Sequence, residues 1–424
     1  MGPTRSTPNR EALRRRSVGV LVGGVALGST GHIAAVTVTS LVAQEIGGDR
    51  SLAGLPAAAV VLGAAFGATI LGAAMGRWGR RWGLAAGYAV AVLGAVVAIA
   101  GIVILSLPIV LLGSLAVGFG NSSNQLSRYA AADMYPTNRR ASAIGTVVWA
   151  ATVGAVIGPN LVEPSGVVAV AVGLPRLAGP YLVPVVLVAL AALLSFIFLR
   201  PDPRELADDS GPRGDLDIPA ASIGAIIRRP TIALAVLALV AGQFVMVLIM
   251  TMTPLHMTDH GHGLSAVGLV ISAHTFGMFA LAPISGRLTD RFGSVPVILV
   301  GAAIIAGSGI LSAVAPPEGE LVLLVALFLL GWGWNLGFVA GSALLTGGVS
   351  VVERARVQGL ADALIWSTAA IASLGSGVLL AGLGYASLGI LGSVIVGVVG
   401  GVLLLGRATV GRPPQAAPLE PIVE

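Results

Sequence analysis

Long apolar runs make up most of this chain, and each is long enough to cross a membrane as a helix. Of its 424 residues, 56% are hydrophobic and 10% are charged, whereas soluble domains carry about 25% charged residues. Roughly 20 apolar residues are needed to span a hydrocarbon core about 30 Å thick. We therefore expect an all-α membrane protein with twelve transmembrane helices. The predicted spans are 17–42, 52–75, 84–106, 108–133, 141–162, 178–199, 231–255, 264–286, 294–315, 320–347, 357–381 and 384–406.

The arginines indicate how these spans are oriented. All 24 basic residues are arginine, a bias typical of bacteria with GC-rich codons. If the N-terminus is cytoplasmic, 21 arginines fall on that side, Arg50 and Arg176 fall outside, and Arg128 lies within the fourth span. Because cytoplasmic loops are enriched in basic residues, we expect both termini in the cytoplasm of a bacterial cell. The arginines do not gather on one face, so the expected partner is the lipid bilayer of the plasma membrane and not nucleic acid.

One long polar stretch divides the predicted spans into two sets of six. Residues 200–230 are rich in proline, glycine and aspartate, which is typical of a linker. The segment from Ala220 to Ile227 within it is a candidate interfacial helix. The expected organisation is a basic cytoplasmic tail (1–16), an N-terminal six-helix bundle (17–199), the linker (200–230), a C-terminal six-helix bundle (231–406) and a C-terminal tail (407–424).

An eight-residue pattern occurs twice, separated by half the chain length. Gly76–Gly83 reads Gly-Arg-Trp-Gly-Arg-Arg-Trp-Gly, and 210 residues later Gly286–Gly293 reads Gly-Arg-Leu-Thr-Asp-Arg-Phe-Gly. Each copy joins two apolar spans, as expected for the two related bundles of a secondary transporter. These turns are predicted to form a conformational gate. Its residues are Gly76, Arg77, Arg80, Arg81, Gly83, Gly286, Arg287, Asp290, Arg291 and Gly293.

Twelve spans in two halves, with this turn repeated, resemble the major facilitator superfamily. The resemblance covers the whole chain and implies two pseudo-symmetric six-helix bundles. In the fifth span, Gly145, Gly154, Gly158 and Pro159 are spaced as in the glycine-rich motif of the superfamily's proton-coupled antiporters, although its next two glycines are absent. Such residues let a helix pack closely and bend, so we assign them to the gate. The alternative is ordinary small-residue packing between membrane helices.

Two positions depart from the resembled exporters. Ser114 stands where they place an arginine ahead of a Gly-x-Gly, so the usual proton-linked arginine is absent. Arg80 stands where the first turn is expected to carry the acid that the second turn keeps as Asp290. An acid there is favoured by the N-terminus of a neighbouring helix, whereas arginine is repelled by it. Arg80 is therefore expected to pair with an acid, for which the candidates are Asp133, Glu353 and Asp362.

Polar side chains near the middle of the spans predict a substrate cavity. The resemblance implies that the first, fourth, seventh and tenth helices line it, and each carries a polar residue at mid-depth. Polar groups in the hydrocarbon region are costly and usually face a bundle interior or cavity. Hydrogen bonding between helices remains the alternative for any one of them. The predicted cavity residues are His32, Asn121, Asn124, Gln125, Gln243, His274, Trp334, Asn335 and Trp366.

Few ionisable residues fall within the spans, and these are the candidates for proton coupling. Asp362 lies five residues into the eleventh predicted span, and His32 and His274 belong to the residue type that titrates near neutral pH. The alternative for Asp362 is a salt bridge with Arg354, Arg356 or Arg80 at the cytoplasmic gate. Arg128 is interpreted as a side chain that snorkels toward the membrane surface.

The outer end of the seventh span is rich in methionine and histidine. His256, His260 and His262 follow Met250 and Met252, and both residue types bind soft or borderline metals. A proline and an Asp-His-Gly turn break the helix there, so no coordination geometry is fixed. We expect an exposed turn and no metal site. The chain has no cysteine, which excludes a disulfide or a thiolate site.

These features predict a secondary active transporter that works by alternating access and exports small amphiphilic molecules. The small-molecule substrate and protons are its expected partners, with the proton gradient as the driving force and no cofactor. Few fixed charges argue against polyanionic substrates, which need arginine clamps. The alternatives are an importer or facilitator of a neutral solute, and a transporter-like sensor or scaffold without flux. No enzyme is expected, since phosphate-binding, hydrolase and metalloprotease motifs are absent.

Overall fold

The computed structural model of the chain describes residues 7–47, 55–207, 226, 228–262, 264–316, 319–347, 349 and 351–410. Most of the predicted linker and of its interfacial helix, and the C-terminal tail beyond residue 410, lie outside the described residues. Within them every regular element is a helix, which confirms the all-α fold.

The first half contains α1 (Thr7–Thr37), α2 (Thr39–Gly47), α3 (Leu55–Trp78), α4 (Arg80–Val103), α5 (Leu107–Asp133), α6 (Arg140–Trp149), α7 (Ala151–Asn160), α8 (Val162–Ala171) and α9 (Gly179–Phe198), with short 3-10 turns η2 (Thr137–Arg139) and η3 (Arg176–Ala178). The second half contains α11 (Pro230–Met250), α12 (Thr253–Asp259), α13 (Leu264–Phe279), α14 (Ala282–Phe292), α15 (Ser294–Ala313), α16 (Glu320–Gly347), α17 (Val351–Leu383) and α18 (Tyr385–Val410).

The described residues contain eleven segments that are long and apolar enough to cross a membrane, and they coincide with eleven of the predicted spans. The remaining predicted span, 108–133, coincides with α5, whose 27 residues suffice in length. The polar run from Asn121 to Gln125, together with Arg128 and Asp133, makes α5 less apolar than the other spans. α5 packs between α3 and α4, so protein rather than lipid surrounds most of its polar residues.

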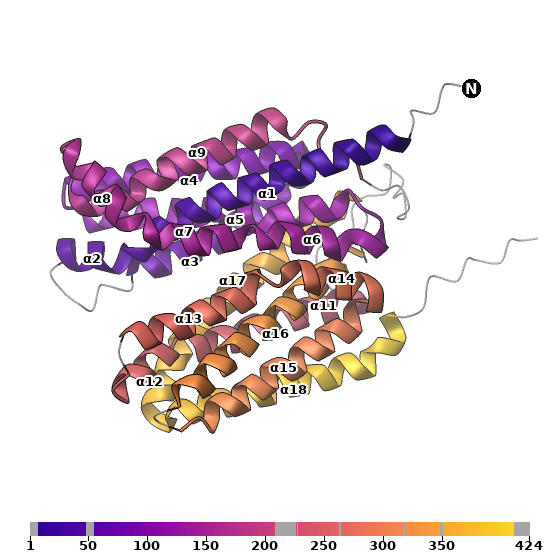
Figure 1. Cartoon of the computed structure of the whole chain (residues 1–424). Helices are drawn as coiled ribbons and strands as arrows, with labels where there is room; N and C mark the ends of the chain where they lie inside the picture. Colours follow the sequence, from indigo (N-terminus) through magenta and orange to yellow (C-terminus); the bar gives the residue numbers. More distant parts are fainter. Residues whose placement is uncertain are drawn as a thin grey trace, which may run out of the picture.

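The helices form two groups that lie side by side (Figure 1). The first group, from indigo to magenta, contains α1–α9, and the second, from red to yellow, contains α11–α18. In the second group α16 packs between α13 and α15, as α5 packs between α3 and α4 in the first. The two groups meet where α3 packs on α17 and where α6 packs on α14.

The contacts between the groups recur at a constant separation of 214 residues. A Cβ atom added to Gly359 of α17 would lie 2.3 Å from the carbonyl oxygen of Ala68 on α3. One added to Gly145 of α6 would lie 2.3 Å from the carbonyl oxygen of Ala282 on α14. Backbone is thus packed against backbone, and both positions need glycine because any side chain would overlap the neighbouring helix.

The same separation corrects the register predicted for the repeated turn. Gly79 and Gly293 have φ angles of 94° and 86°, and each directly precedes the next helix, α4 or α15. Glycine adopts positive φ readily, so these two residues are structural equivalents. Asp290 then corresponds to Gly76 and not to Arg80. The predicted register is wrong by four residues, because both copies contain Gly-Arg pairs that also match at a separation of 210.

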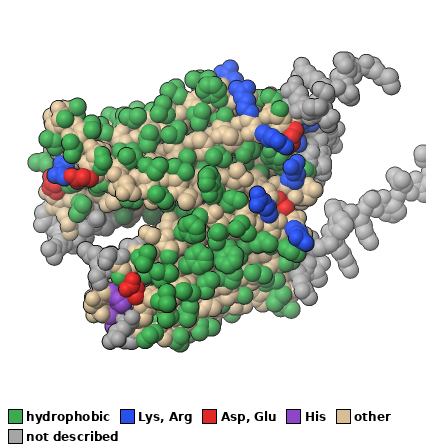
Figure 2. Space-filling view, in the orientation of Figure 1, with side chains coloured by type: hydrophobic (Ala, Val, Ile, Leu, Met, Phe, Trp, Pro, Cys, Tyr) green, Lys and Arg blue, Asp and Glu red, His purple; other side chains and the backbone are tan. Residues whose placement is uncertain are grey.

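The two groups touch at one end of the molecule and separate at the other. We call the end with the α3–α4 and α14–α15 turns the arginine-rich end, and its basic side chains are visible in Figure 2. The glycine contacts described above lie toward this end. Toward the opposite end a groove of about 600 Å³ separates α1 and α7 from α13, with Ile33, Pro159 and Ile271 in its walls. Figure 2 shows the molecule hollowed between the groups at that end.

Candidate functional site

A central cavity of about 190 Å³ lies between the two groups of helices. Its walls come from α1, α5, α6 and α7 of the first group and from α13, α16 and α17 of the second. Nine of its fourteen lining residues were not predicted as cavity residues, among them Arg128, Phe279 and Phe338. Five of the nine predicted cavity residues line it: His32, Asn121, Asn124, Gln125 and Trp366.

One wall of the central cavity is a chain of hydrogen-bonded amides on α5. Nδ2 of Asn124 donates to Oδ1 of Asn121 at 2.8 Å, and the hydroxyl of Tyr88 on α4 donates to Oδ1 of Asn124 at 3.0 Å. His32 on α1 shares the cavity with these amides, and its Nδ1 has no hydrogen-bond partner among the described residues. The cavity thus offers fixed amide groups, one imidazole nitrogen without a partner and the indole of Trp366.

Arg128 and Asp362 form a buried ion pair that joins the two groups at the cavity. Nη2 of Arg128 on α5 donates to Oδ1 of Asp362 on α17 at 2.5 Å, and each side chain is 2% exposed. Nη2 also donates to the hydroxyl of Tyr129 at 3.0 Å, and that hydroxyl lies 3.3 Å from the same carboxylate oxygen. Nε donates to Ser342 on α16 at 3.2 Å. The guanidinium carbon lies 4.2 Å from the ring centroids of both Tyr129 and Phe338.

This pair overturns two interpretations made from the sequence. Arg128 does not snorkel, because its guanidinium is enclosed by groups from α5, α16 and α17 and does not reach the membrane surface. Asp362 does form a salt bridge, but its partner is Arg128 and not Arg354, Arg356 or Arg80. Oδ2 of Asp362 has no hydrogen-bond partner among the described residues, so one carboxylate oxygen is available to accept a proton.

The other four predicted cavity residues form hydrogen bonds with neighbouring helices of the second group. Such bonding between helices was the alternative to a place in the cavity. Oε1 of Gln243 accepts a hydrogen bond from Trp334 Nε1 at 2.9 Å. Asn335 accepts from Ser285 at 2.5 Å and donates to a carbonyl of α13 at 2.6 Å. His274 Nδ1 lies 2.8 Å from a carbonyl of α16. Trp334 stacks on Phe338, with ring centroids 4.5 Å apart, and so supports the cavity wall from behind.

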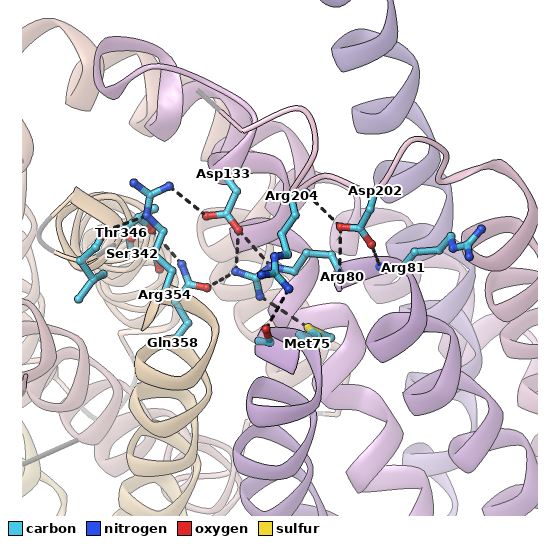
Figure 3. A network of polar contacts seen from close by, with 12 residues as sticks. Met75, Arg80, Arg81, Asp133, Asp202, Arg204, Ser342, Thr346, Arg354 and Gln358 are labelled. Carbon is cyan, nitrogen blue, oxygen red and sulfur yellow. Dashed lines mark hydrogen bonds and ion pairs between the residues drawn. The ribbon is translucent and has the colours of Figure 1, made fainter. Parts of the chain in front are cut away.

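A second buried network joins the groups near the arginine-rich end (Figure 3). Arg80 donates from Nε and Nη2 to Oδ2 of Asp133, at 3.0 and 2.7 Å, and Nη2 also donates to Gln358 on α17. Arg354 of α17 places Nη1 3.7 Å from the other oxygen of Asp133. The expectation that Arg80 pairs with an acid is confirmed for Asp133. Gln358 and Arg354 were not predicted as its neighbours, since sequence spacing does not show which face of α17 meets α3.

Two carboxylates cap helix N-termini at this end. Asp290 on α14 accepts from the backbone N–H groups of Ala141 and Ser142 at 3.0 and 2.9 Å, which confirms the expected contact with a neighbouring helix. Asp202, which follows α9, accepts from the N–H groups of Arg80 and Arg81 at 3.2 and 2.9 Å (Figure 3). Asp290 therefore links the two groups of helices, whereas Asp202 acts within the first group.

Asp290→Ala is expected to loosen the arginine-rich end, and Asp202→Ala is the matched control. Loss of either cap costs about 0.5–2 kcal/mol, but only Asp290 holds helices of different groups together. The chain has no cysteine, so spin labels attached to cysteines introduced at positions 138 and 287 report on this end alone. We expect a longer label distance in Asp290→Ala only. Equal lengthening in both variants would contradict this assignment.

The predicted antiporter glycines lie at close helix contacts. A Cβ atom on Gly154 would lie 2.3 Å from Ser29 of α1, and one on Gly158 would lie 2.9 Å from Ile33. Pro159 lies inside α7, which ends one residue later. With Gly145 at the contact between the groups, this segment packs tightly against both α1 and α14, as its glycine content predicts.

The histidines at the opposite end form ring contacts. His256 stacks on Tyr385 of α18, with ring centroids 4.1 Å apart and planes inclined by 7°. His260 lies 4.3 Å from His256 between ring centroids, and its Nδ1 lies 2.7 Å from the carbonyl oxygen of His256. No group of three potential metal ligands occurs among the residues that the structure describes.

Comparison with known proteins places this architecture in a family. The model of the Major Facilitator Superfamily matches residues 20–273 and 234–422. An uncharacterized MFS-type transporter of Bacillus subtilis, YdeG, is 36% identical over 398 residues, which cover 92% of both chains. The riboflavin transporter RfnT of Brucella anthropi is 32% identical over 395 residues, which cover 91% of this chain and 94% of that protein.

Solved structures share the fold at low sequence identity. The fucose:proton symporter FucP of E. coli has a TM-score of 0.73 and 16% identity, covering 93% of this chain and 98% of that one. The human organic anion transporter MFSD10 has a TM-score of 0.71 and 17% identity, covering 92% and 99%. From the family match and the identity to these relatives, the chain belongs to the major facilitator superfamily and is a membrane transporter and not an enzyme.

Proposed function

We propose that the protein moves a small amphiphilic molecule across the plasma membrane by alternating access about the central cavity. The observation that carries this proposal is a cavity whose walls come from both groups of helices and which an ion pair between the groups adjoins. We take the groups as two six-helix units, residues 17–199 and 231–406, with α5 as the twelfth span and both termini in the cytoplasm. The arginine-rich end is then cytoplasmic, and the described conformation faces outward.

Proton coupling is proposed to occur at Asp362. A proton bound at Oδ2 neutralises the carboxylate, so Arg128 loses its ionic partner and the bond between α5 and α17 weakens. Substrate and proton would thus act on the same ion pair from opposite sides. Arg128 lines the cavity, where the substrate binds, and Asp362, which accepts the proton, is bonded to Arg128. His32, with its unpartnered nitrogen in the cavity, is the second candidate for proton transfer, and His274 is the third.

The cavity chemistry suits a molecule with a planar ring and hydrogen-bonding groups. Trp366 and Phe279 offer aromatic surface, while Asn121, Gln125 and His32 offer polar groups on other walls. Aromatic rings pack well against planar ligands, and a few polar groups fix their orientation. The relative named as a riboflavin transporter makes a flavin-like heteroaromatic a specific candidate for this chain.

Export by proton antiport is the proposed direction, supported by the glycine contacts of α6 and α7 that match the antiporter motif. Uptake of a neutral heteroaromatic solute is the second candidate, and the similarity to RfnT favours it. The proposed transporter needs no cofactor besides the proton gradient.

Flux measurements in everted and right-side-out membrane vesicles, with riboflavin as the probe, distinguish these candidates. Accumulation in everted vesicles that an uncoupler collapses supports export by antiport. Accumulation only in right-side-out vesicles supports uptake. A chain that carries no solute in a screen of amphiphilic probes in either orientation would contradict transport and support a sensor or scaffold.

A further inference from the structure

A basic and aromatic pocket lies on the outside of the first group at the arginine-rich end, away from the central cavity. It has a volume of about 530 Å³ and lies between the α3–α4 turn and the segment that follows α9. Three membrane-spanning segments begin or end here, at Trp78, Arg80 and Phe198. The pocket therefore lies at the level where the hydrocarbon core gives way to lipid headgroups. We call it the headgroup pocket.

Positive charge dominates the headgroup pocket. Its walls include four arginines, Arg77, Arg81, Arg200 and Arg204, and two carboxylates, Asp202 and Glu205, which leaves an excess of two positive charges. Asp202 is already committed, because it accepts hydrogen bonds from three backbone N–H groups, those of residues 80, 81 and 204. The side chains of Arg77 and Arg200 are exposed.

Two exposed tryptophans border the same pocket. Trp78 is 65% exposed and Trp82 is 50% exposed. The guanidinium carbon of Arg81 lies 5.2 Å from the centroid of Trp82, whose ring meets Phe196 of α9 edge-on at 5.0 Å. Tryptophan is enriched at the headgroup level of membranes, where its ring is half in lipid and half in water. Such an arrangement of tryptophan and arginine fits an interfacial site better than an aqueous one.

An apolar face of α9 continues from the pocket toward the membrane interior. Leu190, Leu193 and Ile197 are 47%, 53% and 50% exposed. Their spacing of three and four residues places them on one side of the helix. A ligand with a phosphate at the arginines could therefore lay its acyl chains along this face.

We propose that the headgroup pocket binds the phosphodiester headgroup of an anionic phospholipid, with the acyl chains against α9. Arginine binds phosphate through several N–H donors at once, and basic pockets at the cytoplasmic membrane border recognise anionic lipids. The equivalent turn of the second half lacks two of these residues. At the separation of 214 residues, the counterparts of Arg81 and Trp82 are Val295 and Pro296.

Native mass spectrometry of the purified full-length protein with dioleoylphosphatidylglycerol tests this site. Arg77→Gln/Arg200→Gln is expected to weaken binding roughly 30-fold, since each arginine near an anionic lipid contributes about a factor of five. Arg77→Lys/Arg200→Lys, which keeps the charge, is expected to retain most of the binding. Arg287→Gln/Arg291→Gln removes two exposed arginines from the same end of the second half and is the matched control, with little change expected.

The expected result includes weaker binding of dioleoylphosphatidylethanolamine and no displacement of phosphatidylglycerol by inorganic phosphate. Unchanged lipid binding in Arg77→Gln/Arg200→Gln, or an equal loss in the control, would overturn the proposal. Displacement by inorganic phosphate at equal concentration would also overturn it, because the site would then recognise a free ion and not a lipid.

Discussion

Arg128→Gln is expected to destabilise the protein by about 3–5 kcal/mol, because it leaves the carboxylate of Asp362 buried without an ionic partner. Arg128→Gln/Asp362→Asn is expected to recover much of this loss. Removing both charges of a buried pair is often close to neutral, whereas removing one is costly. The unfolding midpoints of the wild type, Arg128→Gln and the double variant are compared by thermal unfolding in detergent under the same conditions.

A surface ion pair provides the control for this comparison. Arg176 pairs with Glu163 at the opposite end, where the two side chains are 62% and 70% exposed. Arg176→Gln is expected to leave the unfolding midpoint unchanged, since exposed pairs contribute little. If Arg128→Gln is as stable as the wild type, or if the double variant is less stable than the single one, the Arg128–Asp362 pair does not join the two groups as described.

Gly359→Leu is expected to prevent closure of the arginine-rich end. Its Cβ atom would lie 2.3 Å from the carbonyl oxygen of Ala68, so the described conformation would be overpacked at a cost of about 1–3 kcal/mol. The alternative conformation, in which α3 and α17 separate, avoids this cost. Spin labels at positions 138 and 287 are therefore expected to move apart, and accessibility at the opposite end is expected to fall.

Gly375→Leu is the matched control for this variant. Gly375 lies on the same helix, α17, and a Cβ atom there meets nothing within 4 Å. Gly375→Leu is therefore expected to keep the label distance of the wild-type protein. Closure at the arginine-rich end in Gly359→Leu, or opening in both variants, would contradict the role of the glycine contact.

The sequence predicted the helices well because membrane-spanning segments are recognised by length and composition. α5 shows both the strength and the limit of that reasoning. Its bounds, Leu107–Asp133, nearly match the predicted span 108–133, although its composition alone is too polar to mark it as a span. The span 108–133 is predicted in the same way as the other eleven, as a mostly apolar run of sufficient length.

Part of the cavity wall could be predicted, since mid-depth polar residues on α1 and α5 do line the cavity. The predictions that failed concern which face of a helix points into the cavity. Gln243 and Asn335 lie at the right depth but turn toward neighbouring helices, and depth along a span does not specify rotation about its axis. The separation of 214 residues pairs Asn124 with Phe338, and both line the cavity, but it also pairs Asn121 with Asn335, which does not line it. Equivalence between the two halves therefore does not identify the cavity-facing residues.

The partners of the arginines were harder to predict. Arg128 and Asp362 are 234 residues apart, so nothing local links them, and an arginine near the end of a span is commonly a snorkelling residue. The register of the repeated turn failed for a different reason. Arg77 and Arg80 each follow a glycine, so the residue types match at two separations. The glycine contacts between the groups and the positive φ angles of Gly79 and Gly293 distinguish the two.

We propose that a proton on Asp362 releases Arg128 and allows the two groups to rearrange about the cavity. Spin labels at positions 160 and 269, on either side of the groove at the opposite end, measure this rearrangement in reconstituted protein. The label distance is expected to shorten from alkaline to acidic pH in the wild type. Asp362→Asn, which resembles the protonated form, is predicted to show the short distance at both pH values. A wild-type distance that does not depend on pH, or a response to pH that persists in Asp362→Asn, would contradict it.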